Sequence, residues 1–323
     1  MFPAQTSLIP VQIALARFLE NQGWQAIFSD YPYWYLGTTP FMYLTGPILP
    51  IILAVLHQLL PTLSLFDFVW IILSICWIIG GLGVYALAKS LNHAEPYAEQ
   101  RGAAVLAVLF YLFGPIVPFL FRFSDGVYLM AFSLIPLTLL RYLKFLRTPK
   151  FDPLLILLIT FLILLDSQII PTLVLGMAAM LMAESGWKRI EEKLKSSLVF
   201  LFFSFLVATL WYTPGYWWTL LGSPSFGGQG LVQVITWLGK LLPVALALTM
   251  AVVSGKFFKS KNLLRDFTFY WLFIFGFLTL IRFLSDPDFW LDWSAYGVEL
   301  QFGGALALGG WLWKKLEDRR RRT

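Results

Sequence analysis

The chain has 323 residues, of which 59% are hydrophobic and only 13% are charged, and its mean hydropathy is +0.73. A water-soluble fold could not bury so much apolar surface, so this composition excludes an ordinary soluble domain and indicates a membrane protein. The net charge of +6 comes from basic residues gathered between apolar stretches, which favours anionic membrane lipids over nucleic acid as partners.

The first 65 residues differ from the rest of the chain. Residues 5–21 place apolar and polar side chains on opposite helix faces, and residues 31–37 form an aromatic stretch marked by Pro and Gly. Residues 48–60 are apolar but too short to cross a bilayer, which is typical of an interfacial helix. We therefore expect residues 1–65 to be an external loop with amphipathic and interfacial helices, and residues 66–323 to be the transmembrane domain.

Long apolar segments alternate with basic clusters over the remaining chain, and this pattern predicts an all-α polytopic membrane protein of about nine transmembrane helices. The expected spans are residues 68–90, 102–121, 126–146, 153–166, 167–184, 197–213, 231–254, 267–283 and 296–315. The basic clusters are Lys89/Arg101, Arg141/Lys144/Arg147/Lys150, Lys188/Arg189/Lys193/Lys195, Lys256/Lys259/Lys261/Arg265 and Lys314/Lys315/Arg319–Arg322.

Positive loops mark the cytoplasmic side of such proteins. An odd number of spans puts the termini on opposite sides, so we expect a cytoplasmic C-terminus. The N-terminal region and the 213–230 loop are then outside the cytoplasmic membrane of a prokaryote. The pair 153–166 and 167–184 is short for two full crossings, with Asp166 at the bend.

The residues after Met1 contain neither the basic start nor the long apolar run of a signal peptide. A translocated N-terminal region of this length normally follows a transmembrane helix. We therefore expect that the original first transmembrane helix is missing from this chain.

The unusual sequence lies in the predicted external segments. The 213–230 loop has no charged residue, and Gly227-Gly228 permits close approach of another group to the backbone. Trp217 and Trp218 either stack on a sugar ring or belong to the aromatic belt at the interface.

Acids on the predicted outer side are candidates for activating an acceptor hydroxyl, because that chemistry needs a carboxylate. They are Glu20, Asp30, Asp125, Asp166, Asp286, Asp288 and Asp292. The last three are also what a solvated loop would contain. With one cysteine, Cys76, and two distant histidines, the sequence indicates no disulfide, thiol nucleophile or metal site.

Three basic residues outside the clusters, Arg122, Arg282 and Lys240, are candidates for contacting a phosphate. Arg122 could equally pair with Asp125, and Arg282 could snorkel to the interface. Lys240 lies inside an expected span, where a charge is expensive, so a phosphate or a carboxylate such as Glu299 would have to offset it.

Several short motifs, in this order and spacing, resemble the GT-C-type membrane proteins of bacteria and archaea, especially the group labelled 6-pyruvoyl-tetrahydropterin synthase-related. They are Trp34–Pro40, Tyr43–Pro47, Phe113–Pro115, Ser124–Gly126, Leu134–Leu137, Trp211–Pro214 and Pro224–Gly228, followed by Arg282. The resemblance covers essentially the whole chain and implies a GT-C-like fold.

The resemblance also implies a glycosyltransferase that uses a polyprenyl-phosphate sugar donor and an unspecified glycan, lipid or protein acceptor. The sequence indicates no cofactor besides this donor substrate, and it leaves a requirement for a divalent metal open. Such enzymes usually place an essential acid in the first external loop, but residues 2–6 contain none. Asp30 or Glu20 would then be the base. Arg282 and Lys240 would hold the lipid phosphate.

Two other readings remain open. One is a lipid or glycolipid transporter or assembly factor, although such transporters usually show repeated halves, which this sequence lacks. The other is an inactive, truncated copy of the enzyme.

Overall fold

The computed structural model describes residues 9–31, 46–92, 97–123, 125–184, 190–212, 242–254, 262–285 and 296–320. Within these ranges the secondary structure is helical, with no β-strand, which confirms the predicted all-α class. The elements are α1 (Ile9–Gln22), η1 (Gly23–Phe28), α3 (Ile48–Leu59), α4 (Leu65–Leu91), α5 (Tyr97–Phe113), α6 (Val117–Phe123), α7 (Gly126–Ser133), α8 (Ile135–Arg147), α9 (Pro153–Leu165), η2 (Ser167–Ile169), α10 (Ile170–Glu184), α11 (Ile190–Ala208), α14 (Leu263–Ser285) and α15 (Gly297–Arg320), together with the helix Leu242–Ser254.

Five helical segments in the described ranges are long and apolar enough to cross a membrane. They are Leu65–Leu91, Gln100–Arg122, Gly126–Arg147, Ser167–Glu184 and Leu263–Ile281. Shorter apolar helices cover Ile48–Leu59, Pro153–Leu165 and Leu242–Ser254. The chain therefore has the make-up of a membrane protein, while the expected total of nine spans stays a prediction.

Two of the expected spans are interrupted helices. The segment Gln100–Arg122 consists of α5 and α6, which are separated at Gly114-Pro115, and Gly126–Arg147 consists of α7 and α8, which meet at Leu134. Pro115 and Pro136 explain these interruptions, because proline lacks the N–H that continues a helix.

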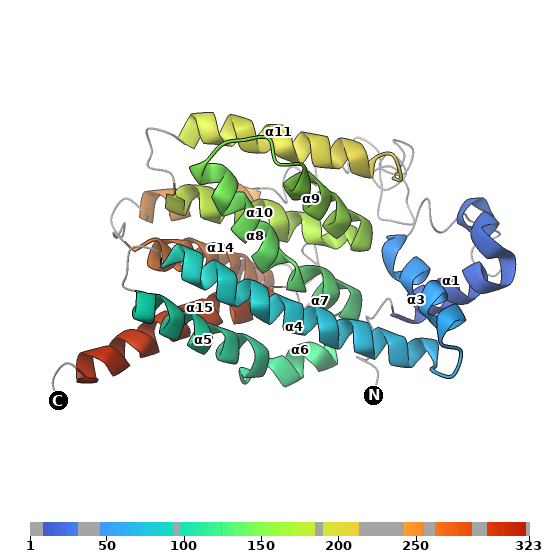
Figure 1. The fold of residues 1–323 in the computed structure, drawn as a ribbon. Coiled ribbons are helices and arrows are strands. Elements are labelled where there is room, and N and C mark those ends of the chain that lie inside the picture. Colours follow the sequence, from blue (N-terminus) through green and yellow to red (C-terminus); the bar gives the residue numbers. More distant parts are fainter. Residues whose placement is uncertain are drawn as a thin grey trace.

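The long helices α4, α5, α10, α11, α14 and α15 lie in stacked layers, whereas α1 and α3 pack together at one end, beside the beginning of α4 (Figure 1). Helix α4 begins with a capping box, in which Ser64 accepts a hydrogen bond from the Asp67 N–H and the Asp67 carboxylate accepts from the Ser64 N–H. This cap fixes the start of the 27-residue helix next to α3.

Small residues let α5 and α15 approach each other closely. A Cβ atom added to Gly309 would lie 2.6 Å from the backbone nitrogen of Ala107 and 2.8 Å from its Cα. Close contact between backbones at Gly and Ala is the usual means of packing helices in a membrane, where the hydrophobic effect does not drive association.

Aromatic side chains fill the interior between α7, α14 and α15. Trp271 is fully buried and packs against Phe267, Phe275 and Phe302. In contrast to these buried rings, α11 exposes a series of large apolar side chains, and their exposure to water would be unfavourable. These are Leu198, Val199, Phe202, Phe203, Phe205 and Leu206. An exposed face of this composition is suited to contact with lipid.

Candidate functional site

Three helix ends meet at one end of the bundle, the end nearer to α1 and α3 (Figure 1). Helix α7 begins at Gly126, α9 gives way to η2 and α10 at Asp166, and α15 begins at Gly297. We refer to the cluster of Tyr128, Asp166, Thr172 and Glu299 found there as the acid end.

Glu299 is fully buried in the first turn of α15, with 0% of its surface exposed. Its Oε1 accepts hydrogen bonds from the hydroxyl of Tyr128 on α7 and, at 2.7 Å, from the hydroxyl of Thr172 on α10. The two hydroxyl oxygens are also 2.7 Å apart. The indole N–H of Trp271 donates to the backbone carbonyl of Glu299 at 2.8 Å. Four helices thus converge on this residue.

The second carboxylate oxygen of Glu299 is buried and has no hydrogen-bond partner among the described residues. The first turn of a helix favours a negative charge, because the backbone N–H groups there carry partial positive charge. Even so, a buried carboxylate whose hydrogen-bond partners among the described residues are neutral hydroxyl groups is expensive, and such a residue in an apolar helix bundle is a functional-site candidate.

Asp166 ends α9 and starts the next helical turn. Its backbone is extended, with φ −153° and ψ 115°, and its Oδ1 accepts from the Gln168 N–H at 2.9 Å. The side chain is buried, with 6% of the residue exposed, and Oδ2 has no hydrogen-bond partner in the described part of the chain. Asp166 is close enough to Tyr128 to interact with it electrostatically.

The N-terminal region contacts this end of the bundle. A Cβ atom added to Gly46 would lie 2.2 Å from the carbonyl oxygen of Leu164 and 2.6 Å from that of Leu165. Only glycine permits this approach, so the segment that leads into α3 lies directly against the turn that carries Asp166. Ile9, the first residue of α1, packs over Gly126 at the beginning of α7.

The sequence-predicted acids occupy different environments. Glu20 on α1 pairs with His57 on α3, with Oε1 and Nδ1 2.7 Å apart. Asp30 is exposed after η1. Asp125 caps α7 by accepting a hydrogen bond from the Val127 N–H at 3.0 Å. Of the predicted acids that the structure describes, Asp166 is the one that lies in the buried cluster.

The predicted basic and aromatic residues are described only in part. Arg122 is exposed on α6, and Arg282 belongs to α14. The remaining predicted binding residues lie outside the described residues, and so do the three acids after α14. These are Lys240, Trp217, Trp218, Gly227, Gly228, Asp286, Asp288 and Asp292. The proposed Lys240–Glu299 pair therefore stays a prediction.

Sequence reasoning missed Tyr128 and Thr172 and considered Glu299 only as a partner for Lys240. Both hydroxyl residues lie in apolar runs, where they look like ordinary helix positions. The one available signal was a glutamate just before the apolar stretch Phe302–Trp313. Among the described residues, no group of three or more His, Cys, Asp or Glu side chains could hold a metal ion.

Comparison with known proteins finds no matching family model, no similar curated protein and no similar solved structure. The likeness to GT-C-type proteins therefore rests on the sequence motifs alone.

Proposed function

We propose that this chain is an integral membrane glycosyltransferase-like protein that transfers a sugar from a polyprenyl-phosphate donor at the external face of the cytoplasmic membrane. The observation that supports this most is the carboxylate of Asp166, which is buried, is fixed by the Gln168 N–H and has one oxygen without a hydrogen-bond partner among the described residues. This oxygen is buried, and in the proposal a bound acceptor hydroxyl reaches it and gives it its proton.

In this proposal Asp166 takes the role that the sequence suggested for Asp30 or Glu20. Glu20 already has a partner in His57, and Asp30 is exposed to solvent, where a carboxylate is well hydrated. A carboxylate that is shielded from water and held by a fixed hydrogen bond is better prepared for general-base catalysis.

The transfer would proceed as a displacement at the anomeric carbon of the donor. The acceptor hydroxyl gives its proton to Asp166, its oxygen forms the new glycosidic bond, and the bond from carbon to the polyprenyl phosphate breaks. Arg282 and Lys240 would neutralise the departing phosphate, since cations stabilise charge that develops there. The 213–230 loop would close over the acceptor.

The test is transfer of radiolabelled sugar from a polyprenyl-phosphate donor in membranes that contain the variant proteins. Asp166→Asn should lower transfer by at least about a hundredfold at unchanged expression, because the proton acceptor is lost. Asp318→Asn, an exposed change on α15, is the matched control and should retain transfer.

Asp30→Asn and Glu20→Gln belong in the same series. If Asp30→Asn abolishes transfer and Asp166→Asn does not, the base is the residue that the sequence indicated. If none of the three acid variants lowers transfer, the proposed reaction is wrong.

A second candidate, a lipid or glycolipid transporter, is favoured by one observation. Buried carboxylates inside an apolar helix bundle also serve as proton relays in transporters, and Asp166 and Glu299 fit that description. Reconstituted vesicles separate the two functions: substrate accumulation without a new glycosidic bond would favour the transporter.

A further inference from the structure

A second polar site lies at the other end of the same helices. The segment Gly126–Arg147 and helix α10 both begin near the acid end, and they meet again where Arg147 contacts Glu184, with Nε and Oε1 3.2 Å apart. Next to this point the turn from α8 to α9 encloses a hollow of about 310 Å³. This volume is at the lower end of the range for small-ligand sites, which begins at roughly 300 Å³.

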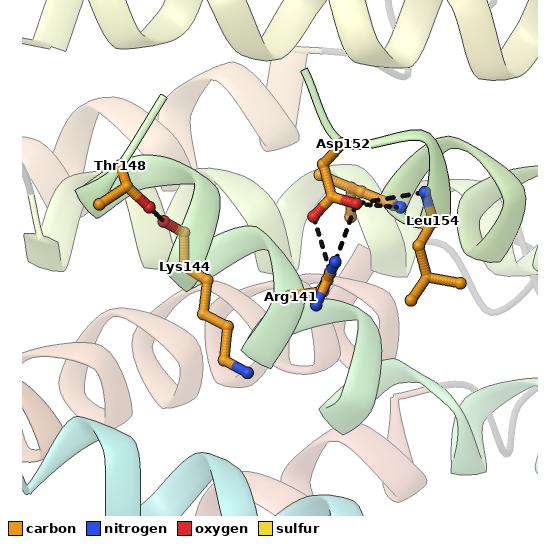
Figure 2. A network of polar contacts seen from close by, with 6 residues as sticks. Arg141, Lys144, Thr148, Asp152 and Leu154 are labelled. Atoms are coloured by element: carbon orange, nitrogen blue, oxygen red, sulfur yellow. Dashed lines mark hydrogen bonds and ion pairs between the residues drawn. The ribbon is translucent and has the colours of Figure 1, made fainter. Parts of the chain in front are cut away.

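Two residues in the lining of this hollow, Arg141 and Asp152, form the ion pair that Figure 2 shows. Arg141 Nε lies 2.6 Å from Asp152 Oδ2, and Arg141 Nη2 donates to Asp152 Oδ1 at 3.2 Å. The same Oδ1 accepts from the Leu154 N–H at 3.1 Å and from the Leu155 N–H at 3.3 Å. Asp152 therefore caps α9 and neutralises Arg141, which fixes the turn.

Two further cations line the hollow without an acid to neutralise them. The side chains of Lys144 on α8 and Lys150 in the turn are exposed, and neither ammonium group contacts a carboxylate of the described residues. Asp152, the acid in the hollow, is already occupied by Arg141. The hollow thus keeps a net positive charge and is suited to an anion.

The hollow continues into an exposed apolar surface. Phe151 in its lining is 74% exposed, and along α9 Leu154 and Leu157 are 47% and 60% exposed. Residues three apart lie on the same helix face, so the two leucines extend the apolar surface away from the lysines. A cationic hollow that opens onto an apolar stripe matches a ligand with an anionic head and an apolar tail.

We propose that this hollow binds the phosphate headgroup of an anionic phospholipid. Lys144 and Lys150 contact the phosphate, the Asp152 cap on α9 holds the turn in place, and the acyl chains lie along Leu154 and Leu157. The site is separate from the acid end, so it is independent of the proposed transferase reaction.

The test is a lipid titration of the purified full chain in detergent, followed by native mass spectrometry, with phosphatidylglycerol and phosphatidylcholine as probes. Phosphatidylglycerol should bind more tightly. The double variant Lys144→Gln/Lys150→Gln should weaken that binding on the order of tenfold, because each cation near a phosphate contributes to the attraction. Both side chains are exposed, so the variant should keep the thermal stability of the parent chain.

The matched control is Lys314→Gln/Lys315→Gln, which removes the same charge from the exposed last turns of α15. It should change phosphatidylglycerol binding less than about twofold if the hollow is specific. An equal loss in both double variants would show only diffuse attraction between the lipid and a basic protein, and it would overturn the proposal.

A variant that should bind lipid more tightly completes the test, because misfolding cannot produce a gain in affinity. Asp152→Asn keeps an oxygen that can cap α9, and it leaves Arg141 without its carboxylate. Phosphatidylglycerol binding should therefore become severalfold tighter. Unchanged or weaker binding in this variant would contradict the site, and so would displacement of the lipid by millimolar inorganic phosphate, which would indicate a site for the free anion.

Discussion

The carboxylates at the two ends of the helix bundle have different kinds of partner. In the turn after α8, Asp152 pairs with Arg141, and at the end of α10 Glu184 pairs with Arg147. At the acid end, Asp166 and Glu299 are more deeply buried, yet their hydrogen bonds come from a backbone N–H and from two neutral hydroxyl groups. Charges with a structural role usually form ion pairs with neighbouring residues. Buried charges without a counter-ion are more often functional.

The most direct test of this contrast replaces one glutamate at each end of the bundle with glutamine. Glu299→Gln keeps the oxygen that accepts from Tyr128 and Thr172, so the helices should stay together. The negative charge that acts on Tyr128 together with the proposed base Asp166 is lost, so transfer from a polyprenyl-phosphate sugar should fall by about tenfold, which is less than in Asp166→Asn because the base itself remains. The measurement is transfer in membranes, together with the thermal stability of the purified chain.

Glu184→Gln is the control at the other end, where the carboxylate only pairs with Arg147. Its transfer should equal that of the parent chain. If both amide variants behave alike, the two ends do not differ in function, and the buried glutamate has a structural role.

The next largest effect concerns the packing of the N-terminal region onto the acid end. Gly46→Ala would place a Cβ atom 2.2 Å from the carbonyl oxygen of Leu164, a backbone atom that cannot move aside without disturbing the turn at Asp166. Overpacking of this kind should lower the free energy of unfolding by about 3 kcal/mol. This change in the free energy of unfolding is measured by unfolding the detergent-solubilised chain with heat or with SDS.

Gly304→Ala is the matched substitution, because a Cβ atom added there meets no heavy atom within 4 Å. It should leave stability unchanged or slightly higher, since alanine favours the helix. Equal stability of the two alanine variants would show that the segment before α3 does not pack against α9.

The local order of apolar and polar residues predicts many of the helices, but it does not predict the contacts between helices that form the acid end. The sequence predicts a bend at Asp166, where α9 ends, and it predicts the apolar run 48–60 as a helix, which the structure has as α3. These features depend on residues that are neighbours in the sequence. Their placement relative to the membrane stays a prediction.

The site depends instead on residues that are far apart in the chain. Glu299 meets Tyr128 and Thr172 across sequence separations of 171 and 127 residues. No periodicity within one helix indicates which neighbouring helix its first turn will face. For the same reason no local pattern shows that Gly46 approaches α9 closely, and this contact is visible only once the helices are packed.

A smaller effect should follow from removing one hydroxyl of the acid end. Thr172→Val retains the shape of the side chain but deletes the hydrogen bond to Glu299 at 2.7 Å. A hydrogen bond to a charged group contributes about 2 kcal/mol, so the free energy of unfolding should fall by about that amount. SDS titration of the parent chain and the variant compares the two directly.

Thr138→Val supplies the comparison, since Thr138 is equally buried but donates only to the carbonyl of Leu134 in its own helical turn. That carbonyl also accepts the Thr138 backbone N–H, so losing the hydroxyl leaves it satisfied. The free energy of unfolding should therefore fall by much less in Thr138→Val than in Thr172→Val. If both variants lose the same amount, the hydroxyl groups around Glu299 contribute nothing specific to the acid end.

The smallest effect is expected for the ion pair between Arg147 and Glu184. Both side chains are partly exposed, at 35% and 18%, so water and salt screen their attraction. A double-mutant cycle with Arg147→Gln and Glu184→Gln should give a coupling energy of about 0.5 kcal/mol that decreases at high salt. A coupling as large as the effect of Thr172→Val would mean that the pair is shielded as fully as the acid end. The two ends would then differ in the counter-ions that the described residues supply and not in burial.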